Sequence, residues 1–347
     1  MPILRAQKMV TPRSIRVDAS SFCQLRCPSC PTTSRAIHPA VGSGFIRLED
    51  FRKLVDANPW LEHVELSNFG EIFLNPNLVG ILEHAYRRGV KVSAGNGVNL
   101  NTARPEALEA VVKFGVQFMT CSIDGASPET YRVYRVRGDF DRVIANIRTI
   151  NAHKRAYGTE LPRLAWQFVV FGHNEHELPV ARQMAEELGM EFRPKLTWDD
   201  SFSPLRDPEF VRQQVGIGAS TRQEYEQQNG QDYMAAICHE LWDMPAVNWD
   251  GKMLGCARNF WGDFGGNAFG DGLLAAINSD KMRYARDMLR GRRPARDDIP
   301  CTTCEIYLGM RRRDHWLHRA SPLSIGGFKA RLRGLYFRCV GRLCRQV

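Results

Sequence analysis

Short apolar or alternating segments recur through the first 200 residues, and a longer stretch with helical spacing of apolar positions follows each of the first five. Residues 63–66, for example, alternate between polar and apolar as a half-buried strand does. We expect strands at 15–17, 63–66, 91–94, 117–123, 164–170 and 191–196. We expect helices at 48–57, 77–88, 105–114, 139–155 and 175–188.

This alternation of short strands with helices of ten or more residues is typical of βαβ units, whose strands lie parallel. Six such units predict an open α/β barrel rather than a closed eight-fold one. Because reactive groups of parallel barrels collect at the C-terminal ends of the strands, polar residues near those ends are candidates for the barrel mouth. The later strands and turns offer Gln167, Asn174, Arg193 and Lys195, and strand alternation places the last two on one side.

Length and composition fit a globular protein with a large core. The chain has 347 residues, of which 44% are hydrophobic, and no apolar run is long enough to span a membrane. Residues 1–15 lack the apolar segment of a secretory signal, so we expect a cytoplasmic protein. The formal net charge of +9 is concentrated in the C-terminal part, which makes a nucleic-acid partner unlikely for the chain as a whole.

The ten cysteines fall largely into close groups, which in a reducing compartment favours metal or cluster ligands over disulfides. Cys23, Cys27 and Cys30 follow the first expected strand with the spacing C-x3-C-x2-C. Three thiolates in one loop can bind a [4Fe-4S] cube and leave its fourth iron open to a small molecule. A zinc site that lacks one ligand, or a chance cluster, is the alternative.

The spacing of these cysteines resembles that of the radical SAM superfamily, in which S-adenosylmethionine binds the open iron and is cleaved to a 5′-deoxyadenosyl radical. Further segments after the strands resemble the family's cofactor-binding loops. Gly70-Glu71 is similar to the GGEP loop, although Phe69 and Ile72 depart from it. The resemblance implies that the cofactor is bound by Gly70, Glu71, Asn96, Ser122, Asp124 and Arg135. Ser127 and Glu129 instead form a helix-start signal around Pro128.

A second group of cysteines lies beyond a polar, glutamine-rich segment. Cys238 and Cys256 flank an expected hairpin with Asp250-Gly251 at its turn, and Cys301 and Cys304 follow as C-x2-C. This arrangement resembles a SPASM domain shortened to the twitch version, which implies an auxiliary [4Fe-4S] cluster. The spacing is similar to that of 2-deoxy-scyllo-inosamine dehydrogenases, and a four-cysteine zinc ribbon is the alternative.

Together these features predict an α/β fold, a partial (β/α)6 radical SAM barrel followed by a small SPASM/twitch auxiliary-cluster domain. We expect an N-terminal extension at 1–13, the barrel at 14–200, a polar helical linker at 201–235, the auxiliary domain at 236–312 and a basic tail at 313–347. An amphipathic helix in the tail could contact an anionic membrane, and Cys339 and Cys344 within it have no assigned role.

The resemblance implies an enzyme with two [4Fe-4S] clusters and S-adenosyl-L-methionine, reduced by a flavodoxin or ferredoxin. We expect it to abstract a hydrogen atom from a small polar substrate, such as a sugar or aminocyclitol, in a dehydrogenation or an epimerisation. Modification of a ribosomal peptide is the alternative enzyme function. A non-catalytic iron-sulfur or zinc-binding protein is the alternative of another class, and the sequence assigns no general base or hydrogen donor.

Overall fold

The computed structural model describes residues 9–34, 36, 37, 39 and 41–317. Its centre is a curved sheet of seven strands in the order β6-β5-β4-β3-β2-β1-β7, and every pair of neighbours is parallel. The strands are β1 (Ser14–Val17), β2 (His63–Glu65), β3 (Lys91–Val98), β4 (Phe118–Ser122), β5 (Arg163–Val170), β6 (Glu191–Leu196) and β7 (Ala246–Val247). The expected open barrel of parallel strands is therefore confirmed.

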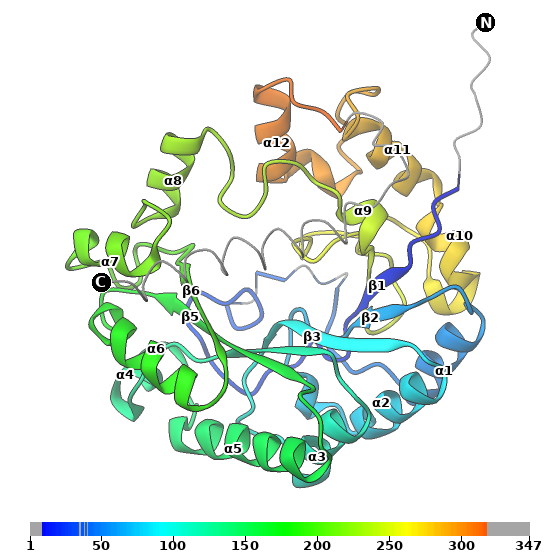
Figure 1. Cartoon of the computed structure of the whole chain (residues 1–347). Coiled ribbons are helices and arrows are strands. Elements are labelled where there is room, and N and C mark those ends of the chain that lie inside the picture. Colours follow the sequence, from blue (N-terminus) through cyan, green and yellow to red (C-terminus); the bar gives the residue numbers. More distant parts are fainter. Residues whose placement is uncertain (1–8, 35, 38, 40, 318–347) are drawn as a thin grey trace, which may run out of the picture.

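Six helices cover the outer face of this sheet, and Figure 1 shows most of them along the rim of the arc. They are α1 (Leu48–Asp56), α2 (Leu78–Arg87), α3 (Pro105–Lys113), α4 (Pro128–Tyr134), α5 (Phe140–Ala156) and α6 (Leu178–Glu187). The helix start predicted at Pro128 is confirmed, because the Ser127 side chain accepts a hydrogen bond from the Thr130 amide.

The two faces of the sheet differ in chemistry. Outward-facing residues such as Val64, Met119 and Trp166 belong to the main hydrophobic core beneath the helices. The alternate positions on the inner face carry polar side chains that are largely buried: Arg16, Asp18, Glu65, Ser67, Ser93, Thr120, Ser122 and Gln167. We call these eight residues the polar inner face. Because burial of an unpaired polar group is costly, this face requires partners.

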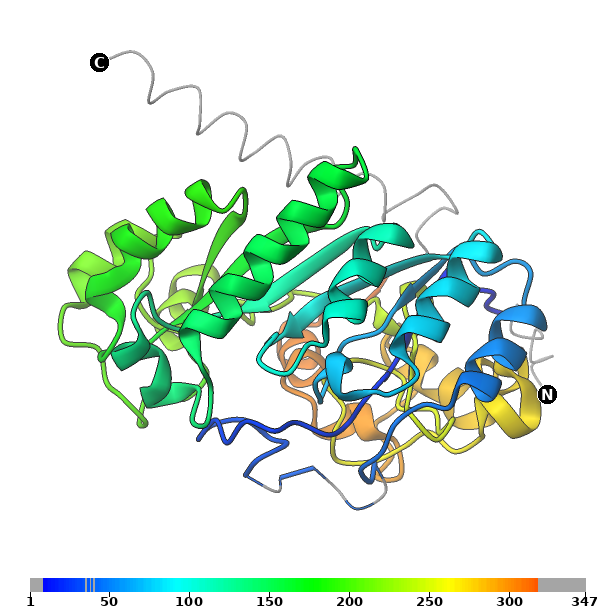
Figure 2. The same ribbon diagram turned by 90° about the horizontal axis from the view of Figure 1, so that it is seen from below.

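The segment 197–317 runs from beside β6, across the open side of the sheet, to β1 (Figures 1 and 2). It contains α7 (Pro208–Val215), α8 (Arg222–Asn229), α9 (Glu240–Asp243), α10 (Leu273–Ile277), α11 (Asp280–Met288) and α12 (Glu305–Arg312). The expected hairpin is a tight turn with an antiparallel bridge between Val247 and Met253, and Gly251 at the turn has φ +88°. Among the described residues, no helix is both long enough and apolar enough to cross a membrane.

One strand pairing was not expected. β7 precedes that turn and pairs in parallel with β1, with Arg16 opposite Ala246 and Val17 opposite Val247. The region of the second cysteine group is thereby joined to the edge of the barrel sheet. The proposed helix in the basic tail, together with Cys339 and Cys344, lies outside the described residues.

Candidate active site

The loop with the first three cysteines begins directly after β1 and passes over the C-terminal ends of the strands. Cys27 is buried, while Cys23 and Cys30 are half-buried. The loop packs on an apolar cluster that includes Tyr134 and Phe171. Its far end is held by the segment after β6, since the Ser29 hydroxyl donates to Asp199 at 2.5 Å and the Trp198 indole donates to the Ser29 carbonyl at 3.0 Å. The three thiols therefore belong to a loop anchored at both ends.

Gly70 lies where the second strand's loop meets the cysteine loop. A Cβ atom on Gly70 would lie 2.4 Å from the Ser20 carbonyl oxygen and 2.5 Å from that of Phe22. The Glu71 amide donates to the same Phe22 carbonyl at 2.7 Å. Glycine is thus needed because two backbones touch at this position.

Glu71 is enclosed just beyond that contact, with 1% of its surface exposed. One carboxylate oxygen accepts a hydrogen bond from the Phe73 amide at 3.1 Å, and the other accepts one from the Asn99 amide. Burial raises the pKa of Glu71 to about 7, although these hydrogen bonds and Arg135 oppose the shift. Glu71 therefore links the second strand's loop to the end of β3.

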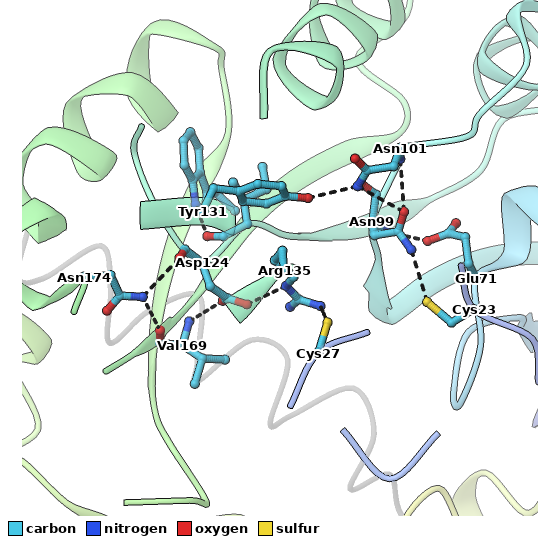
Figure 3. Close-up of polar contacts among 12 residues, drawn as sticks. Cys23, Cys27, Glu71, Asn99, Asn101, Asp124, Tyr131, Arg135, Val169 and Asn174 are labelled. Carbon is cyan, nitrogen blue, oxygen red and sulfur yellow. Dashed lines mark hydrogen bonds and ion pairs between the residues drawn. The ribbon is translucent and has the colours of Figure 1, made fainter. Parts of the chain in front are cut away.

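Asn99 is a site residue that the sequence did not reveal. Its side-chain amide nitrogen lies 3.6 Å from the Cys23 sulfur, and its oxygen accepts a hydrogen bond from Gln24 at 2.7 Å (Figure 3). The predicted strand ended at Ala94, whereas β3 continues to Val98 and so moves the strand end to Asn99. Asn96, the predicted binding residue, is exposed and contacts Ser67 and Asn68 instead.

Asp124 and Arg135 form a buried ion pair beside Cys27. The Arg135 Nε atom lies 2.6 Å from Asp124 Oδ2, and its Nη1 atom lies 3.6 Å from the Cys27 sulfur (Figure 3). The other oxygen of Asp124 accepts a hydrogen bond from the Val169 amide at 2.7 Å. Burial raises the pKa of Asp124, and the positive charge of Arg135 opposes that rise. Burial would lower the pKa of Arg135, but Asp124 and Cys27 outweigh it and raise that pKa.

Ser122 and Asn174, two other residues singled out from the sequence, are both in close contact with neighbouring parts of the chain. Ser122 ends β4 and is buried, and a Cβ atom on Gly97 would lie 2.6 Å from its hydroxyl oxygen. Asn174, in the turn after β5, donates to the carbonyls of Asp124 at 3.1 Å and Val169 at 3.0 Å. Asn174 therefore braces the turn rather than facing the barrel mouth.

Arg193 is also not at the mouth. It shares the inner face with Lys195, as alternation predicts, but its guanidinium lies over the Phe118 ring at 4.6 Å and pairs with Glu191 at 2.6 Å. Phe118 begins β4, so this contact is at the N-terminal end of the strands. The cysteine loop lies at the opposite end.

The second group of cysteines surrounds one small pocket with a volume of about 20 Å³. Cys238, Cys256, Cys301 and Cys304 all line it, and the remaining walls are mostly apolar, with Trp261, Phe264 and Tyr307 among them. Burial, followed by the charges of the other three sulfurs, raises the pKa of Cys301. Among the described residues, no group of three or more His, Cys, Asp or Glu side chains is arranged to hold a single metal ion.

The two cysteine groups are suited to different roles. In the first group, donors from Asn99 and Arg135 point at two of three sulfurs, and such hydrogen bonds tune iron-sulfur clusters. In the second group, four thiols converge on a dry pocket, which is the donor set of a closed [4Fe-4S] cluster. The residues present therefore fit both implied groups.

Comparisons with known proteins agree with this geometry. The model of the radical SAM superfamily matches residues 17–177. The AdoMet-dependent heme synthase of Methanosarcina barkeri is 26% identical over 180 residues, which are 51% of this chain and 48% of that protein. The chain thus spans about half the length of this relative.

Solved structures resemble the chain over more of its length. The Streptococcus suis protein SuiB matches with a TM-score of 0.62 over 90% of this chain and 77% of its own, at 13% identity. The structure of anSMEcpe with bound AdoMet matches with a TM-score of 0.57 over 95% of this chain and 98% of its own, at 15% identity. At such identities the likeness concerns the fold, and it extends beyond the barrel into the second cysteine region.

Proposed function

We propose that this chain, whose residues 17–177 match the radical SAM superfamily, is a radical SAM enzyme that acts on a small polar substrate such as a sugar or an aminocyclitol. When bound, the [4Fe-4S] cluster and S-adenosylmethionine supply a 5′-deoxyadenosyl radical that takes a hydrogen atom from the substrate. The chain's own contribution is to hold the cofactor and the substrate and to keep competing donors away. The observation that carries the choice of substrate is the polar inner face.

Five atoms of this inner face form no well-aligned hydrogen bond among the described residues although they are buried. They are the Nε atom of Arg16, both carboxylate oxygens of Asp18, the hydroxyl of Thr120 and the side-chain oxygen of Gln167. An apolar substrate would leave each of these groups unsatisfied, at about 1–3 kcal/mol apiece. A substrate with several hydroxyl or amino groups supplies the missing partners.

The residues around the cysteine loop have separable roles in this proposal. Cys23, Cys27 and Cys30 hold the first cluster, and the backbone at Gly70 lies by the cofactor's amino group. Glu71, whose two oxygens accept hydrogen bonds from the Phe73 and Asn99 amides, positions that loop. Ser122 lies by the ribose, and Arg135 recognises the carboxylate, which a guanidinium suits. Both oxygens of Asp124 are already engaged by Arg135 and Val169, so Asp124 acts as a positioning residue for Arg135.

The four-cysteine pocket would hold the auxiliary cluster. Its apolar walls exclude water, and all four positions of a cluster there would be occupied by thiolates, which suits electron transfer rather than substrate binding. A dehydrogenation needs such an acceptor for the second electron, whereas an epimerisation needs a hydrogen donor instead. We expect a flavodoxin or ferredoxin to reduce the first cluster and a cytoplasmic location for the enzyme.

The decisive experiment is to reconstitute the protein without oxygen, measure iron and sulfide, and record electron paramagnetic resonance spectra with and without S-adenosylmethionine. About eight irons per chain, with one of two signals shifted by the cofactor, are expected for two four-iron clusters. About four irons with bound zinc would keep the radical enzyme and remove the second electron acceptor. No cofactor-sensitive signal would refute the proposal in favour of a non-catalytic metal-binding protein.

The same preparation tests the substrate. Formation of 5′-deoxyadenosine is measured with dithionite as reductant, alone and with sugars, aminocyclitols or short peptides. Stimulation by polyols is expected. Stimulation by peptides alone would favour peptide modification.

A further inference from the structure

Asp18 is the least satisfied charged group on the polar inner face. It follows β1 directly, its exposed fraction is 0%, and neither carboxylate oxygen has a hydrogen-bond partner among the described residues. Its charged and polar neighbours are Arg16, Asn68, Asp250 and Glu65. Burial raises the pKa of Asp18 to about 7. The charge of Arg16 opposes the shift, as does the Asn68 side-chain amide, which lies close to the carboxylate without forming a well-aligned hydrogen bond, and Asp250 and Glu65 support it.

Asp18 and Glu65 are buried carboxylates on the same face of the sheet, but they differ in their hydrogen bonds. The Glu65 carboxylate accepts hydrogen bonds from the Ser67 amide at 3.0 Å, the Ser67 hydroxyl at 2.6 Å and the Ser93 hydroxyl at 2.6 Å. The Gly95 amide adds another at 2.9 Å. The fold therefore satisfies one buried carboxylate fully, whereas at Asp18 it provides the Asn68 amide close by but no well-aligned hydrogen bond among the described residues.

Two amides beside Asp18 also have one unpartnered atom each. Asn68 accepts from Asn96 through its oxygen at 2.9 Å, and its nitrogen has no partner among the described residues. Asn248 donates through its nitrogen to the Val41 carbonyl at 2.6 Å and to Asp250 at 2.8 Å, and its oxygen has no partner there. Because one atom of each side-chain amide forms these hydrogen bonds, the positions of its oxygen and its nitrogen are assigned.

Backbone contacts bring these groups to one place. The Asp18 amide donates to the Val247 carbonyl at 3.0 Å, which sets the end of β1 against the residue before Asn248. Asn68 follows β2, the neighbour of β1 on its other side. The three side chains thus surround the C-terminal end of β1 and offer two acceptors and one donor.

We propose that Asp18, Asn68 and Asn248 form the subsite for a vicinal diol or amino alcohol of the substrate, which rests on the proposed function and narrows its substrate class. One hydroxyl donates to the Asp18 carboxylate and accepts from the Asn68 nitrogen. The neighbouring hydroxyl or ammonium group donates to the Asn248 oxygen. This pattern matches adjacent substituents of a sugar or aminocyclitol ring and rejects a mono-alcohol.

The position of the subsite suits a substrate between two clusters. Cys23 lies five residues after Asp18 along the chain. From Asn248 the chain passes through a short turn to Cys256 of the four-cysteine pocket. This turn carries Asp250, a charged neighbour of Asp18, and the Trp249 indole donates to the Val41 carbonyl at 3.1 Å. Asp18 has no exposed surface, so a ligand reaches it only after a local rearrangement, and binding is best measured at equilibrium.

The test is equilibrium binding by calorimetry of the reconstituted protein with S-adenosylmethionine. The probes are myo-inositol, D-glucosamine and 2-deoxy-scyllo-inosamine, with cyclohexanol as the probe that has only one hydroxyl. We expect at least one polyol to bind and cyclohexanol to bind at least tenfold more weakly. Asp18→Asn should weaken polyol binding by roughly 10–100-fold, as the loss of a hydrogen bond to a charged group predicts, and Asn68→Ser should weaken it as well.

The matched control is Asp207→Asn at the N-terminus of α7, because Asn caps a helix about as well as Asp and the site is remote. Iron content equal to the wild type shows that each variant is folded. Equal binding by Asp18→Asn and the wild type would overturn the proposal, as would a crystal structure in which an ordered water, and not the polyol, occupies the subsite.

The outcomes separate this subsite from the proposed function. If the wild type cleaves S-adenosylmethionine but binds none of the polyols, the subsite is wrong and the radical enzyme stands. If polyols bind in a manner that depends on Asp18 while no cleavage occurs, the subsite stands and the proposed function is wrong.

Discussion

Replacement of Gly70 by alanine should displace the cysteine loop. The added Cβ atom would lie 2.4, 2.5 and 2.7 Å from the Ser20 carbonyl oxygen, the Phe22 carbonyl oxygen and the Phe22 amide nitrogen. All three are backbone atoms of the segment that leads into Cys23. No side-chain rotation can relieve such a contact, so either the loop or the Gly70 backbone must move.

The expected magnitude follows from this geometry. Overpacking of one methyl group in a tight interior costs typically about 1–3 kcal/mol. For a domain of 150–250 residues, about 1 kcal/mol lowers the melting temperature by roughly 2–4 °C, which places the loss at roughly 2–12 °C. The same shift would misplace the thiols and the Glu71 amide, which donates to Phe22 at 2.7 Å, so iron incorporation should fall too.

The assay combines thermal unfolding of the metal-free protein with iron content after anaerobic reconstitution. Gly270→Ala is the matched control, because a Cβ atom there would meet nothing closer than 3.9 Å and the residue has no positive φ. The control should behave like the wild type. If Gly70→Ala melted with the wild type and bound the same amount of iron, the backbone contact would not be what requires glycine.

Three further predictions follow from the site. Cys27→Ala should abolish formation of 5′-deoxyadenosine, whereas Cys301→Ala should retain it and lower the iron content to about four per chain. Full cleavage of S-adenosylmethionine by the Cys27 variant would contradict the assignment of Cys27 to the first cluster. Arg135→Met leaves Asp124 buried without its cation and should lower the free energy of unfolding by about 3–5 kcal/mol. The double variant with Asp124→Asn should recover part of this loss, as measured by thermal unfolding. Because the pKa of Asp18 is raised from 3.8 to about 7 in the folded protein, the stability linked to its protonation is present below pH 3.8 and lost as pH rises through 7. Asp18→Asn should therefore gain stability over the wild type between pH 5 and 8, up to about 4 kcal/mol, and a pH-independent difference in melting temperature would refute this.

Most of the barrel could be predicted because its signal is local. Each strand and the helix after it carry their own periodicity, and the parallel order follows from their alternation. The pairing of β7 with β1 escaped prediction because two residues, Ala246 and Val247, are too short a segment to show a period, and the hairpin expected after Val247 gives no sign of a partner so distant in sequence. Pairing between strands that are distant in sequence cannot be predicted from the residues of so short a segment.

The error at β3 has a physical cause as well. Gly95, Asn96 and Gly97 have the composition of a turn, yet β3 passes through them with an irregularity in its pairing with β4 between Ala94 and Val98. Gly97 has φ +126° and lies against Ser122, so the glycine marks a close approach within the strand rather than its end. The same misreading selected Asn96 and missed Asn99.

The hydrogen-bond state of a buried carboxylate is the least predictable property of this site. Asp18 and Glu65 both lie on the inner face near the ends of neighbouring strands, and local sequence does not distinguish them. The difference is that the loops after β2 and within β3 supply donors to Glu65, whereas β7 offers Asp18 only the backbone carbonyl of Val247 and the turn after it adds a second carboxylate, Asp250. Only tertiary packing decides which acid is satisfied.

β1 connects the two cysteine regions through the backbone. The first three cysteines follow its C-terminal end, and β7, which leads to the four-cysteine pocket, pairs along its edge. Arg16 reinforces this junction, since it donates to the Ser67 carbonyl at 2.7 Å and lies near Glu240, which in turn neighbours Cys238 and Cys256. The separation between the two predicted clusters is therefore set by strand pairing rather than by a flexible linker. A substrate held at Asp18 would lie at that same strand, so one rigid element positions the hydrogen abstraction, the polar contacts and the electron acceptor together.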